Sequence, residues 1–166
     1  MNDDINEVSI VECLDIIRSE YEIERNKKQS FDNRAGLLIT IIAAVCIFVL
    51  KDISLKDIGI LMKAPLTFPL LVKILAGINL YLSFIITVIA VLFVICTRQY
   101  DNMEVASFNE KLYFQPKREC LTRLIIAYRD IIVQHRKINK RVAIALKIAI
   151  VGVVTIFISI AFYINF

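Results

Sequence analysis

"NKKQSFDNRAGLLITIIAAVCIFVL", residues 26–50, passes directly from charged residues into uncharged apolar sequence. Sixteen residues from Ala35 to Leu50 carry no charge. A helix of that length covers about 24 Å, slightly less than the roughly 30 Å hydrocarbon core of a bilayer. Phe31 at one end and Ile53 or Leu55 at the other are expected to complete the crossing. The stretch therefore predicts a transmembrane helix, which we assign to residues 35–51.

Two more segments of the chain have the same character. Residues 78–97 carry no charge, and residues 142–166 carry only Lys147, which lies near enough to the start of the segment to reach the membrane surface. Hydrophobic residues make up 58% of the 166-residue chain, and the mean hydropathy of +0.67 is high for a soluble domain. These features predict an all-α membrane protein with about three transmembrane helices.

The first 34 residues predict an amphipathic helix that precedes the first crossing. Apolar residues recur there at steps of four, three and four: Ile10, Leu14, Ile17 and Tyr21. Residues 1–34 contain nine acidic residues and five Lys or Arg. Anionic lipid would repel a helix with this excess of negative charge. We expect it to pack on the basic part of the same chain. It lacks the basic and apolar regions of a cleavable signal peptide, so we expect it to be retained.

The connection over residues 52–77 is mixed in character. Pro65 and Pro69 predict a turn followed by the restart of a helix. Residues 70–76 are expected to form an interfacial segment, anchored by Lys73, that leads into the second crossing.

The region 98–141 is basic and predicted to be helical. It holds ten Lys or Arg against five acidic residues. Pro116 ends its weakly patterned first part. Beyond it an a/d stripe begins, which requires a helical neighbour: Leu121, Leu124, Tyr128, Ile131, His135, Ile138 and Val142. Nothing breaks the pattern before the third apolar segment, which predicts one long helix over residues 117–163.

The distribution of positive charge predicts the topology. The basic region 98–141 and the cluster before the first crossing favour the cytoplasmic side, and the stretch 51–77, with four lysines, is expected outside. The N-terminus would then be cytoplasmic and the C-terminus external.

The sequence shows no recognisable catalytic motif. It has one histidine, no GxSxG or HExxH motif and no Gly-rich phosphate-binding loop. The pair Glu22 and Glu24 resembles a solvated helix face. The cysteines lack CxxC spacing and are expected to be small buried residues: Cys13, Cys46, Cys96 and Cys120. We expect that the protein is not an enzyme and uses no cofactor or metal.

Polar residues gather instead at the borders of the first and third crossings, and they are the candidate ligand-binding or gating residues: Lys28, Asp32, Arg34, His135, Arg136, Asn139, Lys140 and Arg141. Arg136 and Lys140 share a helix face and could hold a phosphate-bearing ligand beside Asn139. The basic cluster could equally be a positive anchor on anionic lipid. Nucleic-acid binding is not expected, because the basic stretch lacks interleaved exposed aromatics.

Two of these residues have a structural and a regulatory interpretation. Asp32 could pair with Lys140 or Arg141 to lock two helices together, or the same groups could separate when a ligand competes for the cations. His135 occupies an a position, which suits either a buried core histidine or a charge switch near neutral pH.

Small residues near the crossings allow close helix approach, which makes self-association into a homo-oligomer plausible: Ala35, Gly36, Ala43, Ala44, Ala143, Ala145 and Ala149.

"KKQSFDNRAGLLITIIAAV" (27–45) and "INKRVAIALKIAIVGVV" (138–154) resemble motifs of small transmembrane effectors of bacterial anti-phage defence. The nearest are the Pycsar transmembrane effectors, whose D-x-K/R-A pattern before the first crossing is similar to Asp32, Arg34 and Ala35. Their late N-x-K/R motif is similar to Asn139 and Arg141. Related membrane effectors serve other nucleotide-signalling systems and retrons.

The resemblance implies an inner-membrane protein that senses a phage-induced signal, such as a cyclic pyrimidine mononucleotide. It would then assemble and impair the membrane, causing abortive infection. A different class of function, a non-toxic membrane adaptor or assembly factor that recruits a cytoplasmic partner, also fits three crossings with a helical polar part. A channel within one subunit is harder to build, since the crossings contain no carboxylate.

Overall fold

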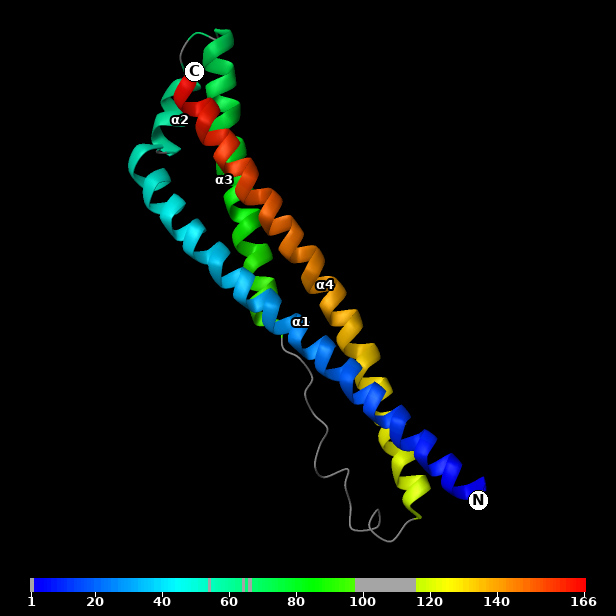
Figure 1. Cartoon of the computed structure of the whole chain (residues 1–166). Coiled ribbons are helices and arrows are strands. Elements are labelled where there is room, and N and C mark those ends of the chain that lie inside the picture. Colours follow the sequence, from blue (N-terminus) through cyan, green and yellow to red (C-terminus); the bar gives the residue numbers. More distant parts are fainter. Residues whose placement is uncertain (1, 54, 64, 66, 98–115) are drawn as a thin grey trace. The chain divides into compact units, whose positions relative to one another are not determined.

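Four helices make up almost all of the described chain in this computed structural model (Figure 1): α1 (Asn2–Asp52), α2 (Leu55–Leu61), α3 (Phe68–Cys96) and α4 (Lys117–Asn165). The structure describes residues 2–53, 55–63, 65, 67–97 and 116–166. No strand occurs within these ranges. Three of the helices, α1, α3 and α4, are long and apolar enough to cross a membrane. The prediction of an all-α membrane protein is confirmed.

Local sequence explains where α3 and α4 begin. Thr67 precedes α3 in an extended conformation, and Pro69 lies in the first turn, where a missing backbone N–H costs nothing. Pro116 directly precedes α4, and its carbonyl accepts the backbone N–H of Glu119 at 2.9 Å. The predicted helix restart at the proline pair is observed, with α3 beginning at Phe68 between the two prolines, and so is the long helix from residue 117.

The amphipathic N-terminal segment and the first apolar stretch, expected as segments 1–34 and 35–51, are one uninterrupted helix, α1. No Pro occurs in it, and Gly36 is its only glycine. A helix of 51 residues is far longer than the roughly 20 residues that a crossing needs. Its first part is therefore available for packing outside the hydrocarbon.

The chain divides into two compact units. The first, called the polar unit below, consists of Met1–Ser30 and Arg98–Arg141. The second, called the apolar unit, consists of Phe31–Thr97 and Val142–Phe166. Helices α1 and α4 each contribute residues to both units. Within the expected basic region 98–141, residues 98–115 lie outside the described part of the chain.

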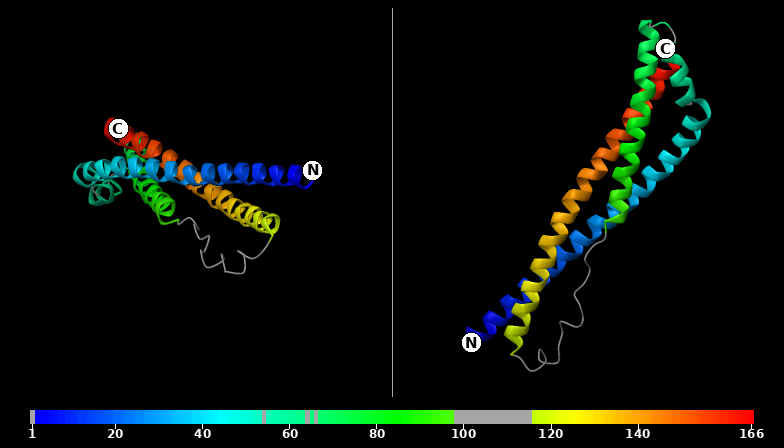
Figure 2. Two further views of the ribbon diagram at one scale, coloured as in Figure 1. Left: turned by 60° about the horizontal axis from the view of Figure 1, so that its bottom comes forward. Right: turned by 180° about the vertical axis from the view of Figure 1, so that it is seen from behind.

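In the polar unit, the first part of α1 and the first part of α4 run side by side, as the views in Figures 1 and 2 agree. The apolar stripe predicted on each helix faces inward. Ile10, Leu14, Ile17 and Tyr21 of α1 are half-buried. On α4 every member of the predicted a/d stripe is buried or half-buried, which confirms that this stripe has a helical neighbour.

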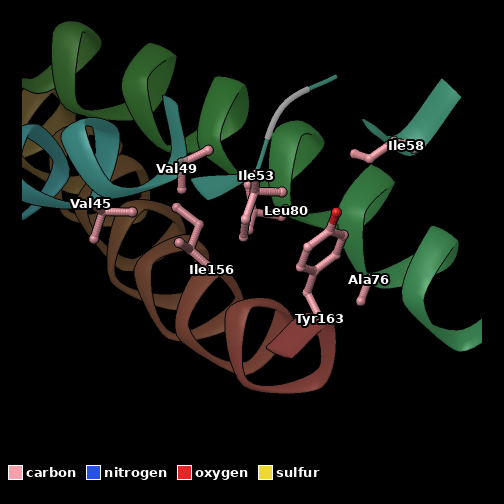
Figure 3. Packing of buried hydrophobic residues seen from close by; sticks show 8 residues of the cluster. All are labelled: Val45, Val49, Ile53, Ile58, Ala76, Leu80, Ile156 and Tyr163. Carbon is pink, nitrogen blue, oxygen red and sulfur yellow. The ribbon is translucent and has the colours of Figure 1, made fainter. Parts of the chain in front are cut away.

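In the apolar unit, a compact core joins α2 and α3 to the second parts of α1 and α4 (Figure 3): Val45, Val49, Ile53, Ile58, Ala76, Leu80, Ile156 and Tyr163. Polar side chains on α3 add contacts between elements. Asn79 Nδ2 donates to Ser159 Oγ at 2.8 Å, and the Tyr81 hydroxyl donates to the Ile53 carbonyl at 2.6 Å. Both hydrogen bonds satisfy polar groups that would find no hydrogen-bond partner among lipid acyl chains.

Helices α3 and α4 approach each other closely at Gly152. A Cβ atom at this position would overlap the hydroxyl oxygen of Thr87. Glycine is therefore required there by the distance between the two helices, as in many membrane helix pairs. Of the small residues noted in the sequence, Ala35, Ala145 and Ala149 are buried within the chain. Gly152, which permits this close contact, was not among them.

The outer surface of the apolar unit is covered with large apolar side chains. On α3 alone these include Leu75, Ile78, Leu82, Ile85, Ile86, Ile89, Leu92 and Phe93. Water-soluble domains rarely expose a continuous apolar surface of this kind. The exposed apolar surface fits a lipid bilayer as the surroundings of these helices.

The four cysteines are free. Cys46 and Cys120 are half-buried, whereas Cys13 and Cys96 are exposed. The expectation of buried cysteines is wrong for these last two, because each lies on the outer face of its helix.

Candidate functional site

Among the described residues of the polar unit, four polar side chains are buried, where the two stripes pass from apolar to charged residues. Glu24 and Lys28 of α1 are 3% and 5% exposed, and His135 and Asn139 of α4 are 0% and 5% exposed. We call these four residues the polar cluster. Burying polar and charged groups costs free energy unless they are hydrogen-bonded. The contacts of the cluster therefore matter both for stability and for any change of state.

Glu24 is the centre of the cluster because its carboxylate collects three side-chain donors. Lys27 Nζ lies 2.7 Å from Oε1, Asn139 Nδ2 lies 3.0 Å from Oε2, and Arg136 Nε lies 3.4 Å from Oε1. Asn139 Nδ2 also donates to the Glu24 backbone carbonyl at 2.9 Å. A single acidic residue on α1 is thus held by two residues of α4.

Arg136 links the buried carboxylate to the surface. Its Nη2 atom lies 2.5 Å from Glu20 Oε2, and its Nε atom lies 3.4 Å from Glu24 Oε1. Glu20 and Glu24 are one helical turn apart on α1, so one guanidinium bridges two successive carboxylates. Because Arg136 and Glu20 are about half exposed, this outer ion pair is open to water and salt.

The environment of Glu24 favours its ionised form. Burial acts to raise the pKa of the Glu24 carboxyl, but the hydrogen bonds from Lys27, Asn139 and Arg136 and the charge of Lys27 outweigh it and hold this pKa below its ordinary value. Glu24 lies outside the uncharged stretch that begins at Ala35. The contact between α1 and α4 here therefore depends on an ionised carboxylate.

Aromatic rings cover one side of the cluster. The Tyr21 ring lies 5.6 Å from the His135 ring and 5.5 Å from the Tyr128 ring, the latter in an edge-to-face arrangement. His135 is fully buried, as the core interpretation of this residue expected. These rings limit access of water to the polar groups next to them.

The side chain of Asn139 is only partly hydrogen-bonded. Within the described part of the chain, the buried Asn139 Oδ1 has no hydrogen-bond partner, because both bonds of this side chain come from Nδ2. A buried acceptor without a donor costs about 1–3 kcal/mol. The cluster is therefore well connected around Glu24 but incomplete at Asn139.

The candidate residues from the sequence fall into two groups. Lys28, His135, Arg136 and Asn139 belong to the polar unit, all but Arg136 are buried, and Arg136 and Asn139 bind the same carboxylate. Lys140 and Arg141 also belong to the polar unit, on α4, but are exposed. Asp32 and Arg34 are exposed residues of α1 in the apolar unit. Pairing of Asp32 with Lys140 or Arg141 stays a prediction.

Two acidic residues of the site, Glu20 and Glu24, were not among the candidates predicted from the sequence. Glu22 is exposed as predicted, but the interpretation of Glu24 as part of a solvated face is wrong, because its carboxylate is buried against α4. The signal was present: the steps of four, three and four that define the α1 stripe continue from Tyr21 to Glu24 and Lys28. The pairing of Glu20 and Glu24 with Arg136 confirms that the acidic N-terminal helix packs on the basic segment.

The chemistry available in this site is ion pairing and hydrogen bonding. Over the described residues, no group of three or more His, Cys, Asp or Glu is arranged to hold a metal ion. Arg136 and Asn139 are donors suited to a carboxylate or phosphate, and the protein's own Glu20 and Glu24 engage them. An external anion would have to compete with these two residues.

Comparisons of the chain with protein-family models, with curated proteins and with solved structures found no match.

Proposed function

We propose that this protein is a signal-gated membrane effector of bacterial antiviral defence, which self-associates in the inner membrane and disrupts it during abortive infection. The N-terminus would be cytoplasmic and the C-terminus external. The observation that carries the proposal is the Glu24 cluster: it joins the only two described helices that leave the polar unit, and both α1 and α4 continue as apolar membrane segments. A change in the cluster is thereby linked covalently to two crossings.

The proposed signal is an anionic ligand, such as a cyclic pyrimidine mononucleotide, or a partner protein with an acidic surface. A phosphate can accept from Arg136 and Asn139 as the two carboxylates do. Replacing Glu24 would leave its own buried charge uncompensated, so binding favours separation of α1 from α4. A ligand shifts such an equilibrium only as far as it prefers the open state. The resting protein is then the form with the Glu24 contacts intact.

The incomplete hydrogen bonding of Asn139 supports the gating role. A fully satisfied cluster would hold the helices firmly, whereas a buried acceptor without a donor lowers the cost of opening. A ligand that donates a hydrogen bond to Asn139 Oδ1 would bind more tightly, because it would satisfy this acceptor. Asn139 is also one of the two residues that resemble the late N-x-K/R motif of the Pycsar transmembrane effectors.

The test is membrane potential in growing cells. Cells that express the protein are compared with and without a co-expressed cyclase that makes a cyclic pyrimidine mononucleotide, using a potential-sensitive dye and growth curves. We expect depolarisation and growth arrest only when the signal is present. With Glu24→Gln we expect depolarisation without the signal, because the carboxylate that holds Arg136 is lost. Glu22→Gln, the same change at an exposed residue two positions before Glu24, is the matched control.

If neither the wild type nor Glu24→Gln depolarises cells under any signal, the effector proposal is wrong.

A membrane adaptor is the second candidate, and one observation favours it. The polar unit exposes large apolar residues on both helices, with pairs seven residues apart: Ile16 and Ile23 on α1, Ile126 and Val133 on α4. Such residues could hold a soluble partner. Under this alternative, Ile126→Ser with Val133→Ser would abolish co-purification of a partner at native expression, and overexpression of the wild type would be harmless.

A further inference from the structure

A groove on the apolar unit is lined in part by a lysine side chain, that of Lys147. It lies between α3 and α4, has a volume of about 340 Å³, and is lined by Ser83 and Ile86 on α3 and by residues between Lys147 and Thr155 on α4. All these residues belong to one compact unit, so the shape of the groove does not depend on the polar unit. Its location differs from that of the polar cluster.

The walls of the groove are apolar. Ile86, Ile148 and Val151 line it and are exposed on the outer surface of the helices, where lipid is expected. Gly152 also lines the groove and contributes only backbone atoms to it. The Thr155 hydroxyl donates to the Val151 carbonyl at 2.9 Å, so this polar group is satisfied by the helix itself. An acyl chain fits such a surface better than any polar ligand.

Lys147 supplies the charge. Its side chain is exposed, and it is the only Lys, Arg, Asp or Glu in residues 142–166. It lies six residues beyond Arg141, about 9 Å along the helix axis, which a lysine can span to reach the headgroup level. The groove continues to Thr155, eight residues or about 12 Å further along α4. The Lys147 ammonium therefore lies at the end of the apolar groove that is nearer the membrane surface.

Charge decides between a lipid and a second copy of the chain as the occupant. A cation at the edge of hydrocarbon is costly without an anion. None of the three apolar stretches, 35–50, 70–97 and 142–166, contains Asp or Glu. A second copy packed by its crossings would therefore bring no carboxylate to Lys147. A phospholipid brings both a phosphate and an acyl chain.

We propose that this groove binds one anionic phospholipid, with its phosphate paired to the Lys147 ammonium and one acyl chain lying over Ile148, Val151 and Gly152. The bound lipid would cover the groove between α3 and α4 where the two helices approach closely. The proposal does not depend on the antiviral function, because it concerns only the apolar unit.

The experiment is native mass spectrometry of the full-length protein, purified in detergent and incubated with phosphatidylglycerol or phosphatidylcholine. We expect one phosphatidylglycerol per chain to be retained in preference to phosphatidylcholine. Lys147→Gln should weaken this retention about fivefold, the typical contribution of one lysine near anionic lipid. Lys147→Arg should restore it. Lys63→Gln, the same charge change at an exposed lysine outside the groove, should leave it unchanged.

A second pair of variants tests the acyl-chain part. Val151→Trp should fill the groove and reduce retention while Lys147 is kept, whereas Val154→Trp, at an exposed position outside the groove, should not. Retention that is equal in the wild type, Lys147→Gln and Val151→Trp would overturn the proposal. So would equal retention of both lipids, or a protein dimer that depends on Lys147 in place of bound lipid.

Discussion

The two units of this protein pack helix α4 against its neighbours by opposite chemistry. In the polar unit, α1 and α4 meet through a buried carboxylate held by Asn139 and Arg136. In the apolar unit, α4 meets α3 through a glycine against Thr87 and through the neutral Asn79–Ser159 hydrogen bond. Charged contacts respond to pH, salt and competing ions, whereas close apolar packing does not. A device that must respond to a signal belongs in the polar unit, and a rigid membrane part belongs in the apolar unit.

The largest expected effect is on the apolar unit. Gly152→Val should destabilise the protein by about 3 kcal/mol, because the new side chain would force α3 and α4 apart. Thermal unfolding in detergent micelles measures this loss. Gly36→Val is the matched control, since nothing lies within 4 Å of a Cβ atom at Gly36. Equal stability of the two variants would show that the α3–α4 contact is looser than described.

A smaller effect is expected from Asn139→Leu in the polar unit. This change removes the two hydrogen bonds that Asn139 donates to Glu24, leaves the one from Arg136, and should cost about 2 kcal/mol. Pairing of α1 with α4 can be followed by the distance between spin labels at Ser19 and Gln134, two exposed positions. Asn26→Leu, an exposed change on α1, is the control. If both variants keep the wild-type distance, the cluster does not hold the helices together.

The pH dependence should differ between the units. Because the pKa of Glu24 is lower in the folded protein than the ordinary value of about 4.3, protonation favours the separated helices. Its stabilising contribution is complete above about pH 4.3 and is lost as the pH falls through the lower folded pKa. Spin-label distances in the polar unit, measured from pH 6 to pH 3, should lengthen in the wild type. Glu24→Gln should show a much weaker dependence, and an unchanged profile would contradict this role of Glu24.

The smallest expected effect is at the surface of the polar unit. Glu20→Gln removes the outer ion pair with Arg136 and should cost less than about 1 kcal/mol, since both side chains are half exposed. The cost should shrink further in high salt. Comparing unfolding of this variant and of Glu22→Gln at low and high ionic strength measures the difference. A large, salt-independent loss would mean that the pair is more buried than described.

Much of the fold was predictable because it depends on patterns within one segment. Long apolar stretches, the prolines at the starts of α3 and α4 and the four-three spacing of apolar residues all act over a few turns. The contacts that create the site do not. Glu24 finds Asn139 from 115 positions away, and its charged neighbours made it resemble a solvated residue. Gly152 likewise gains its importance only from Thr87, on another helix.

The most direct test of the gating account uses purified protein in liposomes loaded with a self-quenching dye. We predict little leakage with the wild type and rapid leakage with Glu24→Gln at equal insertion, while Glu22→Gln behaves as the wild type. Equal leakage from all three proteins would contradict the claim that the Glu24 cluster controls what the crossings do.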